Sequence, residues 1–233
     1  TASSHNYMFK HLDVKDGLSN NQVNAIYKDS HGFMWFGTAS GLNRYDGYDT
    51  RIYRSLKDDG NSLPDSYIED IQEDATGNLW VRTGAGYAIY NSVSDIFDRN
   101  VEGWMWHIGI SGNPSTVYID SEKIFWIYVA GKGIYCYKPG QENAVMVAGT
   151  DTLLTEMNIT DMTECSEGIL LAFGNGVLAC LDREKLNVKW TFDGIASQWG
   201  KNQSETFTLF VDSHERVWMY SVEGMWVYHL PKK

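Results

Sequence analysis

The side chains best suited to chemistry in this chain are its aspartates, histidines and cysteines, and their spacing decides what they can do. Aspartates stand six residues before four of the nine tryptophans, as the pairs Asp29–Trp35, Asp74–Trp80, Asp120–Trp126 and Asp212–Trp218. Calcium takes about six to eight oxygen ligands, and none of these segments supplies that many. We therefore predict no metal site and no cofactor, and we assign these eight residues to structure.

No combination of residues typical of a catalytic centre occurs at the required spacing. The HExxH motif, the nucleophile elbow and paired CxxC motifs are absent. His31 and His214 occupy the same place in two similar segments, "DSHG" and "DSHE", which favours a role in turns. Paired carboxylates for glycoside hydrolysis stay open as an alternative, because sequence does not show how 30 acidic side chains are separated in space. We predict no catalytic residue.

The three cysteines, Cys136, Cys165 and Cys180, are an odd number and lack the spacing of metal ligands. We expect buried thiols, with a bridge between two of them as the alternative. Their number and spacing therefore do not fix the redox compartment of the protein.

Composition indicates a folded chain and disfavours nucleic acid and the membrane as partners. Hydrophobic residues make up 43% and aromatic residues 14%, which argues against disorder. The formal net charge of −11 disfavours nucleic acid as a partner, because phosphates attract clustered Lys and Arg. The start "TASSHNYMFK" has no apolar segment of a signal peptide, and the longest apolar stretch, 168–181, is broken by Gly and Asn. We expect no membrane contact by this chain.

The glycines and aromatic residues belong to a repeat rather than to a site. Segments similar to "DSHGFMWFGTASGLNRYDG" recur with a period of 45 to 47 residues, with anchors at Trp35, Trp80, Trp126, Leu171 and Trp218. The glycine pairs at 84–86, 131–133 and 174–176 then fall in hairpin turns rather than in phosphate loops, since no helical pattern follows them. A period near 45 with short apolar runs and Gly-rich turns is typical of a β-propeller.

We predict an all-β propeller with five visible four-stranded blades in a single domain or propeller fragment over 1–233. The repeat units are expected at about 14–55, 63–99, 115–149, 158–193 and 205–230. In the first unit the strands are expected at 23–29, 33–38, 41–47 and 50–55. The last unit lacks a fourth strand, and an N-terminal strand at about 7–13 would complete it and cover two exposed edges. The alternative is a piece of a larger propeller.

The first 55 residues resemble a known family. The elements "DGLS" (16–19), "DSHGFMWFGT" (29–38) and "GLNRYDG" (41–47) are similar to the two-component-regulator propeller of hybrid two-component sensors, which are membrane receptors of glycan-degrading bacteria. The similarity is looser to position 91 and extends only to the repeat beyond it. The second unit lacks the "GLNR" element, and the fourth has Leu171 in place of Trp.

This resemblance implies a periplasmic propeller that senses oligosaccharides and passes the signal to a histidine kinase absent from this chain. It also implies further partners from the same receptor, namely another propeller or an immunoglobulin-like domain, and leaves a homodimer open. Two alternatives from the residues themselves are a propeller-fold polysaccharide lyase or hydrolase and a purely structural dimerisation propeller.

Two connectors between units carry residues that the repeat does not explain. The connector at 100–115 holds Trp104, Trp106 and His107, and the one at 194–205 holds Trp199, Lys201 and Asn202. In a propeller these connectors emerge on the same face as the hairpin turns between the second and third strands. Indole rings beside polar groups suit a sugar, so these six residues are the predicted ligand contacts. The alternative is that the tryptophans cover the blades or meet another domain.

Overall fold

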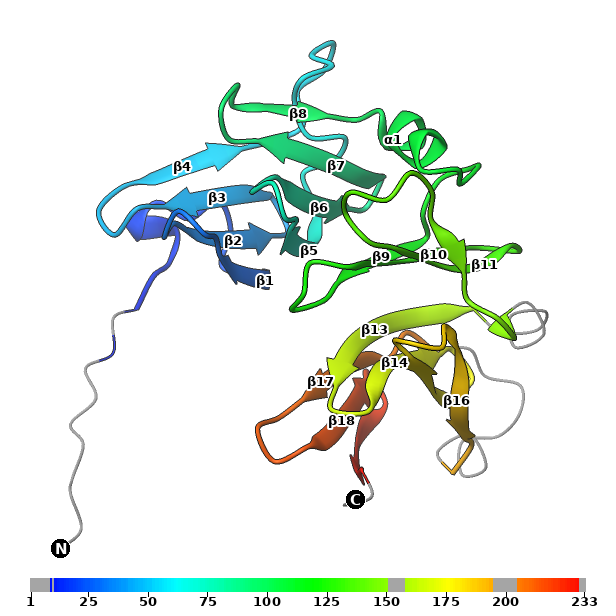
Figure 1. The fold of residues 1–233 in the computed structure, drawn as a ribbon. Helices are drawn as coiled ribbons and strands as arrows, with labels where there is room; N and C mark the ends of the chain where they lie inside the picture. The colour runs from blue at the N-terminus through cyan, green and yellow to red at the C-terminus, as the bar shows by residue number, and fades with distance from the viewer. Residues whose placement is uncertain (1–8, 10, 151–157, 195–204, 231–233) are drawn as a thin grey trace, which may run out of the picture. The chain divides into compact units, whose positions relative to one another are not determined.

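The computed structural model describes residues 9, 11–150, 158–194 and 205–230, and in them the chain is an all-β propeller with five antiparallel blades (Figure 1). Its residues divide into two compact units, 1–100 and 101–233, which are described separately below. Among the described residues, no helix has the length and apolar character needed to cross a membrane.

The first unit holds a short 3-10 helix, η1 (Val14–Asp16), and two blades. Blade 1 consists of β1 (Val23–Lys28), β2 (Met34–Thr38), β3 (Gly41–Tyr45) and β4 (Thr50–Tyr53). Blade 2 consists of β5 (Ile68–Glu73), β6 (Leu79–Thr83), β7 (Gly86–Asn91) and β8 (Ile96–Asp98). The four strands expected in the first unit are thus confirmed, each ending up to two residues from its predicted limits.

The second unit begins with helix α1 (Val101–His107) and holds three blades. Blade 3 consists of β9 (Thr116–Ile119), β10 (Phe125–Val129), β11 (Gly133–Tyr137) and β12 (Val145–Met146). Blade 4 consists of β13 (Ile159–Cys165), β14 (Gly168–Phe173), β15 (Leu178–Asp182) and β16 (Asn187–Phe192). Blade 5 has three strands in the described residues: β17 (Thr208–Val211), β18 (Arg216–Ser221) and β19 (Gly224–His229).

The strand expected at 7–13 is not formed by its described residues, and no described strand completes blade 5. Residues 7, 8 and 10 lie outside the described residues. The backbone around Asp13 is used locally instead, because Asp13 caps η1: its side chain accepts from the Lys15 N–H at 2.6 Å, and Asp16 accepts from the Asp13 N–H at 3.1 Å.

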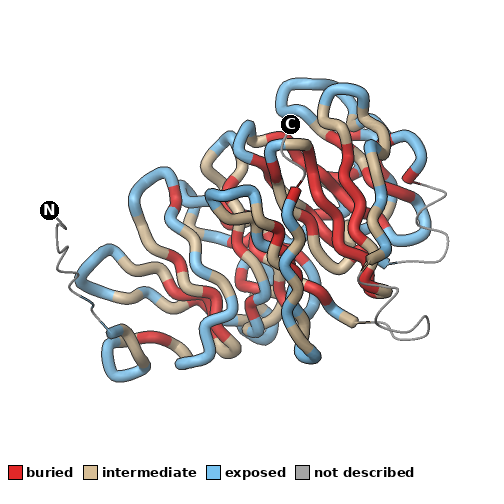
Figure 2. Tube along the Cα trace, turned by 90° about the horizontal axis from the view of Figure 1, so that it is seen from below, coloured by how far each residue is buried: buried red, intermediate tan, exposed pale blue. Residues whose placement is uncertain are grey.

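Apolar faces of neighbouring blades form the cores within each unit, and Figure 2 shows the buried residues along the strands and the exposed ones at the turns. Blades 1 and 2 share a cluster that includes Trp35, Ile71 and Val81. Blades 3 and 4 share one around Trp126 and Phe173, while blades 4 and 5 share another. Blade 4 lies between blades 3 and 5, which explains why its middle strand β14 is buried on both faces. The strand β10 of blade 3 is packed against blade 4 through Trp126 and against α1 through Phe125.

The aspartate–tryptophan pairs hold the first hairpin of four blades. One carboxylate oxygen accepts the indole N–H in each pair: Asp29–Trp35 at 2.7 Å, Asp74–Trp80 at 3.2 Å, Asp120–Trp126 at 3.0 Å and Asp212–Trp218 at 3.0 Å. The other oxygen of Asp29 accepts from the backbone N–H groups of His31 and Phe33. In blade 5 the His214 backbone N–H donates to Asp212 as the His31 N–H donates to Asp29. Both histidines are therefore turn residues, as predicted.

Blade 4 has neither the aspartate nor the tryptophan of this pair, and its anchor residue lies one position before the predicted Leu171. Its hairpin pairs Thr163 with Leu170, whereas blade 1 pairs Tyr27 with Trp35 at the equivalent place. The tryptophan position is therefore occupied by Leu170 and not by Leu171. The physical reason is a tighter turn, in which Cys165 pairs directly with Gly168 and one loop residue is lost.

Cys165 stands at the aspartate position of blade 4, and Cys180 pairs with Leu170 on the neighbouring strand. A hydrogen bond from the Cys180 thiol lowers the pKa of Cys165, and the same contact together with burial raises the pKa of Cys180. All three cysteines are buried free thiols, as predicted.

Replacing Asp120 by alanine should lower the free energy of unfolding by about 2–4 kcal/mol, because the substitution leaves the buried Trp126 indole N–H and two backbone N–H groups without an acceptor. Urea denaturation followed by tryptophan fluorescence measures the change. Glu142→Ala, at an exposed position on the same blade, serves as the control and should change the midpoint little. Equal effects of the two variants would contradict the assigned role.

Candidate functional site

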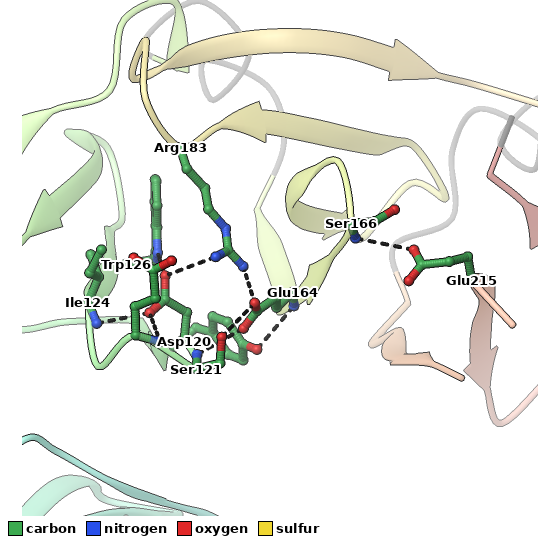
Figure 3. A network of polar contacts seen from close by, with 10 residues as sticks. Asp120, Ser121, Ile124, Trp126, Glu164, Ser166, Arg183 and Glu215 are labelled. Atoms are coloured by element: carbon green, nitrogen blue, oxygen red, sulfur yellow. Dashed lines mark hydrogen bonds and ion pairs between the residues drawn. The ribbon is translucent and has the colours of Figure 1, made fainter. Parts of the chain in front are cut away.

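The first polar cluster that stands out lies at the turn between β9 and β10 (Figure 3). Asp120 accepts from the backbone N–H groups of Glu122 and Ile124 at 3.0 and 2.9 Å, in addition to the Trp126 indole. Glu164, at the end of β13, accepts from the Ser121 N–H at 2.8 Å and from the Ser121 hydroxyl at 2.7 Å. The cluster therefore joins blade 3 to blade 4.

Arg183, in the turn after β15, completes this cluster. Its guanidinium pairs with Glu164 and lies 4.0 Å from the Asp120 carboxylate. Burial opposes ionisation of Glu164, but the bond and charge of Arg183 and the donors of Ser121 together lower its pKa below the ordinary value. Because both carboxylates are occupied by donors and the pKa of Glu164 is lowered, the cluster suits a structural joint rather than acid–base catalysis.

The same joint connects blades 1 and 2. Glu73, at the end of β5, accepts from the Ser30 N–H at 3.0 Å and from the Ser30 hydroxyl at 2.7 Å. Blades 4 and 5 use a different carboxylate, since Glu215 accepts from the Ser166 N–H at 3.1 Å. Sequence reasoning missed these residues, although a signal existed: a serine follows the aspartate position of one unit, and a glutamate precedes that position in the next.

Of the predicted ligand contacts, Trp104 is turned toward the protein. Its ring centroid lies 5.1 Å from that of Phe125 and 5.7 Å from that of Tyr137, so the indole covers β10 and β11. The neighbouring positions Val101 and Met105 of α1 are also buried. Trp104 thus has the packing role that the sequence left as the alternative.

Trp106 and His107 lie on the other side of α1. The Trp106 side chain is 71% exposed, and His107 is exposed with its Nδ1 2.6 Å from the Gly103 carbonyl oxygen. Since residues two apart on a helix point in different directions, the structure separates Trp104 from Trp106. Trp199, Lys201 and Asn202 lie outside the described residues.

The connector that carries Trp106 is fixed to blade 3. Lys132, in the turn between β10 and β11, donates to the Ser111 hydroxyl at 2.6 Å and to its carbonyl at 2.8 Å. The Ala144 N–H donates to the Ile108 carbonyl at 2.8 Å. The contact from Lys132 bears out the expectation that connectors and these hairpin turns emerge on the same face. In the described residues, no three His, Cys, Asp or Glu side chains converge as metal ligands.

Trp104→Ala should lower the free energy of unfolding by about 2 kcal/mol or more, because it removes aromatic packing on β10 and β11. Trp106→Ala should change it by less than about 0.5 kcal/mol, since exposed positions contribute little. The two variants are each other's control in urea denaturation. A larger loss for Trp106→Ala would show that its ring is packed in solution.

The stability of the joint between blades 3 and 4 should fall in acid. Since the pKa of Glu164 is lower in the folded chain than its ordinary value of 4.5, its ionised form contributes stability that is present above that value. This contribution is lost as the pH falls through the folded pKa. Unfolding curves from neutral pH to about pH 3 should therefore show a smaller pH dependence for Glu164→Gln than for the unchanged chain. Parallel pH profiles would contradict the shift.

The first hairpins of blades 1 and 2 match a known family model. The family model described as two component regulator propeller matches residues 17–40 and 62–85, which cover β1–β2 and β5–β6. Histidine kinase P4 of Formosa agariphila is 41% identical over 62 residues, which are 27% of this chain and 4% of that protein. The chain thus spans a small fraction of this relative.

Solved structures with a similar fold include two extracellular domains from B. thetaiotaomicron. That of the hybrid two component system BT3049 is 19% identical with a TM-score of 0.65, over 94% of this chain and 30% of that one. That of BT4673 is 18% identical with a TM-score of 0.55, over 91% of this chain and 34% of that one. At these identities the likeness shows the fold alone. In sequence, residues 17–40 and 62–85 of the first two blades are similar to two component regulator propeller repeats.

Proposed function

We propose that this chain is a non-catalytic ligand-sensing propeller in the periplasmic part of a hybrid two-component signalling receptor. The observation that carries the proposal is the match of the two component regulator propeller model at equivalent hairpins of blades 1 and 2. The fold shared with extracellular domains of two-component systems supports the extracytoplasmic location.

The ligand class that we propose is an oligosaccharide. Trp106 offers an exposed indole ring on a connector held by Lys132 and Ile108, which is a fixed platform on which the apolar face of a sugar can stack. The downstream histidine kinase and the immunoglobulin-like domain belong to the same proposal as partners that receive the signal.

The described carboxylate clusters favour binding over turnover. A glycoside hydrolase needs one carboxyl group that holds a proton and another that is free to act as a base or nucleophile. Glu164 instead has a lowered pKa and is occupied by Ser121 and Arg183, while Asp120 is occupied by an indole and two backbone donors. Neither residue is available for proton transfer.

Calorimetric titration with oligosaccharides released from plant and algal polysaccharides should show saturable binding, and chromatography of the same mixtures should show no new products. Trp106→Ala should weaken binding at least ten-fold, about 1.4 kcal/mol, through loss of the stacking surface. Tyr48→Ala, which removes a 92% exposed ring in the other unit, is the matched control. Product formation would support the lyase or hydrolase, and the absence of both binding and turnover would favour the structural propeller.

A further inference from the structure

A cavity of about 330 Å³ opens in the first unit beside β4 and β8. Its walls come from the end of β4, the loop at 54–62 and the turn before β8. The volume lies at the lower end of the range of small-molecule sites, which is about 300–1,000 Å³. The cavity joins segments about 45 residues apart, so each blade supplies one side.

One wall is built around the Asp95 carboxylate. One oxygen accepts the hydroxyl groups of Tyr53 and Tyr90, both at 2.8 Å, and the other pairs with Arg51. The Tyr53 ring packs against those of Tyr90 and Phe97, each with centroids 5.5 Å apart. These contacts fix the Asp95 carboxylate in place, and its charge is compensated by that of Arg51.

A second wall, the loop at 59–62, is fixed by Arg99. Its guanidinium donates to the carbonyl oxygens of Asp59, Ser62 and Leu63 at 2.9, 2.6 and 2.7 Å, and to the Ser62 hydroxyl at 2.7 Å. Four bonds from one side chain hold the loop in place before any ligand arrives. The Ser62 and Leu63 side chains are buried under the loop.

Polar groups without a partner among the described residues line this preformed cavity. Arg54 uses only its Nε, which donates to the Ser40 carbonyl at 3.0 Å, so its terminal nitrogens are free to donate. The Asn61 side-chain amide has no hydrogen-bond partner, and one oxygen of Asp59 accepts only from the Asn61 N–H at 2.9 Å. Leu56, 56% exposed, adds an apolar lip.

We propose that this cavity binds the neutral terminal sugar ring of an oligosaccharide ligand, an inference that rests on the proposed function. Sugar hydroxyl groups both donate and accept, and a carboxylate, an amide and a guanidinium together offer acceptors and donors for them. Two arginines and two aspartates give the lining no net charge, which disfavours a phosphate. The apolar lip suits the C–H face of the ring.

Amide chemical shifts during titration with maltose, cellobiose and laminaribiose at millimolar concentration provide the test. At least one disaccharide should shift the amides of residues 59–62 and Asp95 in a saturable manner. Asp59→Asn and Asn61→Ala should each weaken that binding at least ten-fold. Asp58→Asn, one position along the same loop and outside the lining, is the matched control and should bind as the unchanged chain does.

The outcomes separate this inference from the proposed function. Oligosaccharide binding that Trp106→Ala abolishes and the two cavity variants retain would overturn the cavity site and leave the sensing function standing. Shifts at residues 59–62 with glycine or inorganic phosphate, and with none of the sugars, would overturn the ligand class. No saturable shift anywhere with any disaccharide or with the longer oligosaccharides would contradict both.

Discussion

The hydrogen bond between an aspartate and the indole of a tryptophan six residues later is the constraint on which the blades depend. Burying an indole removes about 150–250 Å² from water, worth roughly 4–6 kcal/mol, so packing supplies most of the stability. The N–H at the end of that ring would nevertheless be left without an acceptor. The aspartate provides one, and with its second oxygen it closes the turn between the first two strands. A single side chain thereby couples the turn to the core.

Blade 4 shows how the constraint can be released. With Leu170 at the tryptophan position there is no indole N–H to satisfy, and the aspartate is replaced as well, by Cys165. The thiol contacts Cys180 in the apolar space between blades 4 and 5. Both members of the pair change together, which is what a physical coupling between them requires. The shorter turn follows, because no carboxylate spans it.

Between blades, carboxylates serve a second structural purpose. Glu73 and Glu164 reach from the end of one innermost strand to the serine in the turn of the preceding blade. The serine donors hold these two acids in the joints between blades. The surfaces left for recognition are those that the repeat does not use: the exposed side of α1 and the cavity between the outer strands of blades 1 and 2. Both are preformed, which suits a binding module.

The sequence by itself determined the repeat, the blade count, the strands of the first blade and the turn roles of Asp29 and His31, because turn chemistry and strand alternation are local. It did not determine the register of blade 4, since Leu170 and Leu171 are both leucines and a shift of one residue keeps either of them close to the period of the repeat. Tertiary structure alone decided between Trp104 and Trp106, which are the same residue type two positions apart: the short helix α1 turns one toward Phe125 and the other toward solvent. The cavity is also a product of tertiary structure, because Asp59 and Asp95 line it together only when two blades stack. Contacts between distant segments depend on packing, and packing is not encoded in any single stretch of the chain.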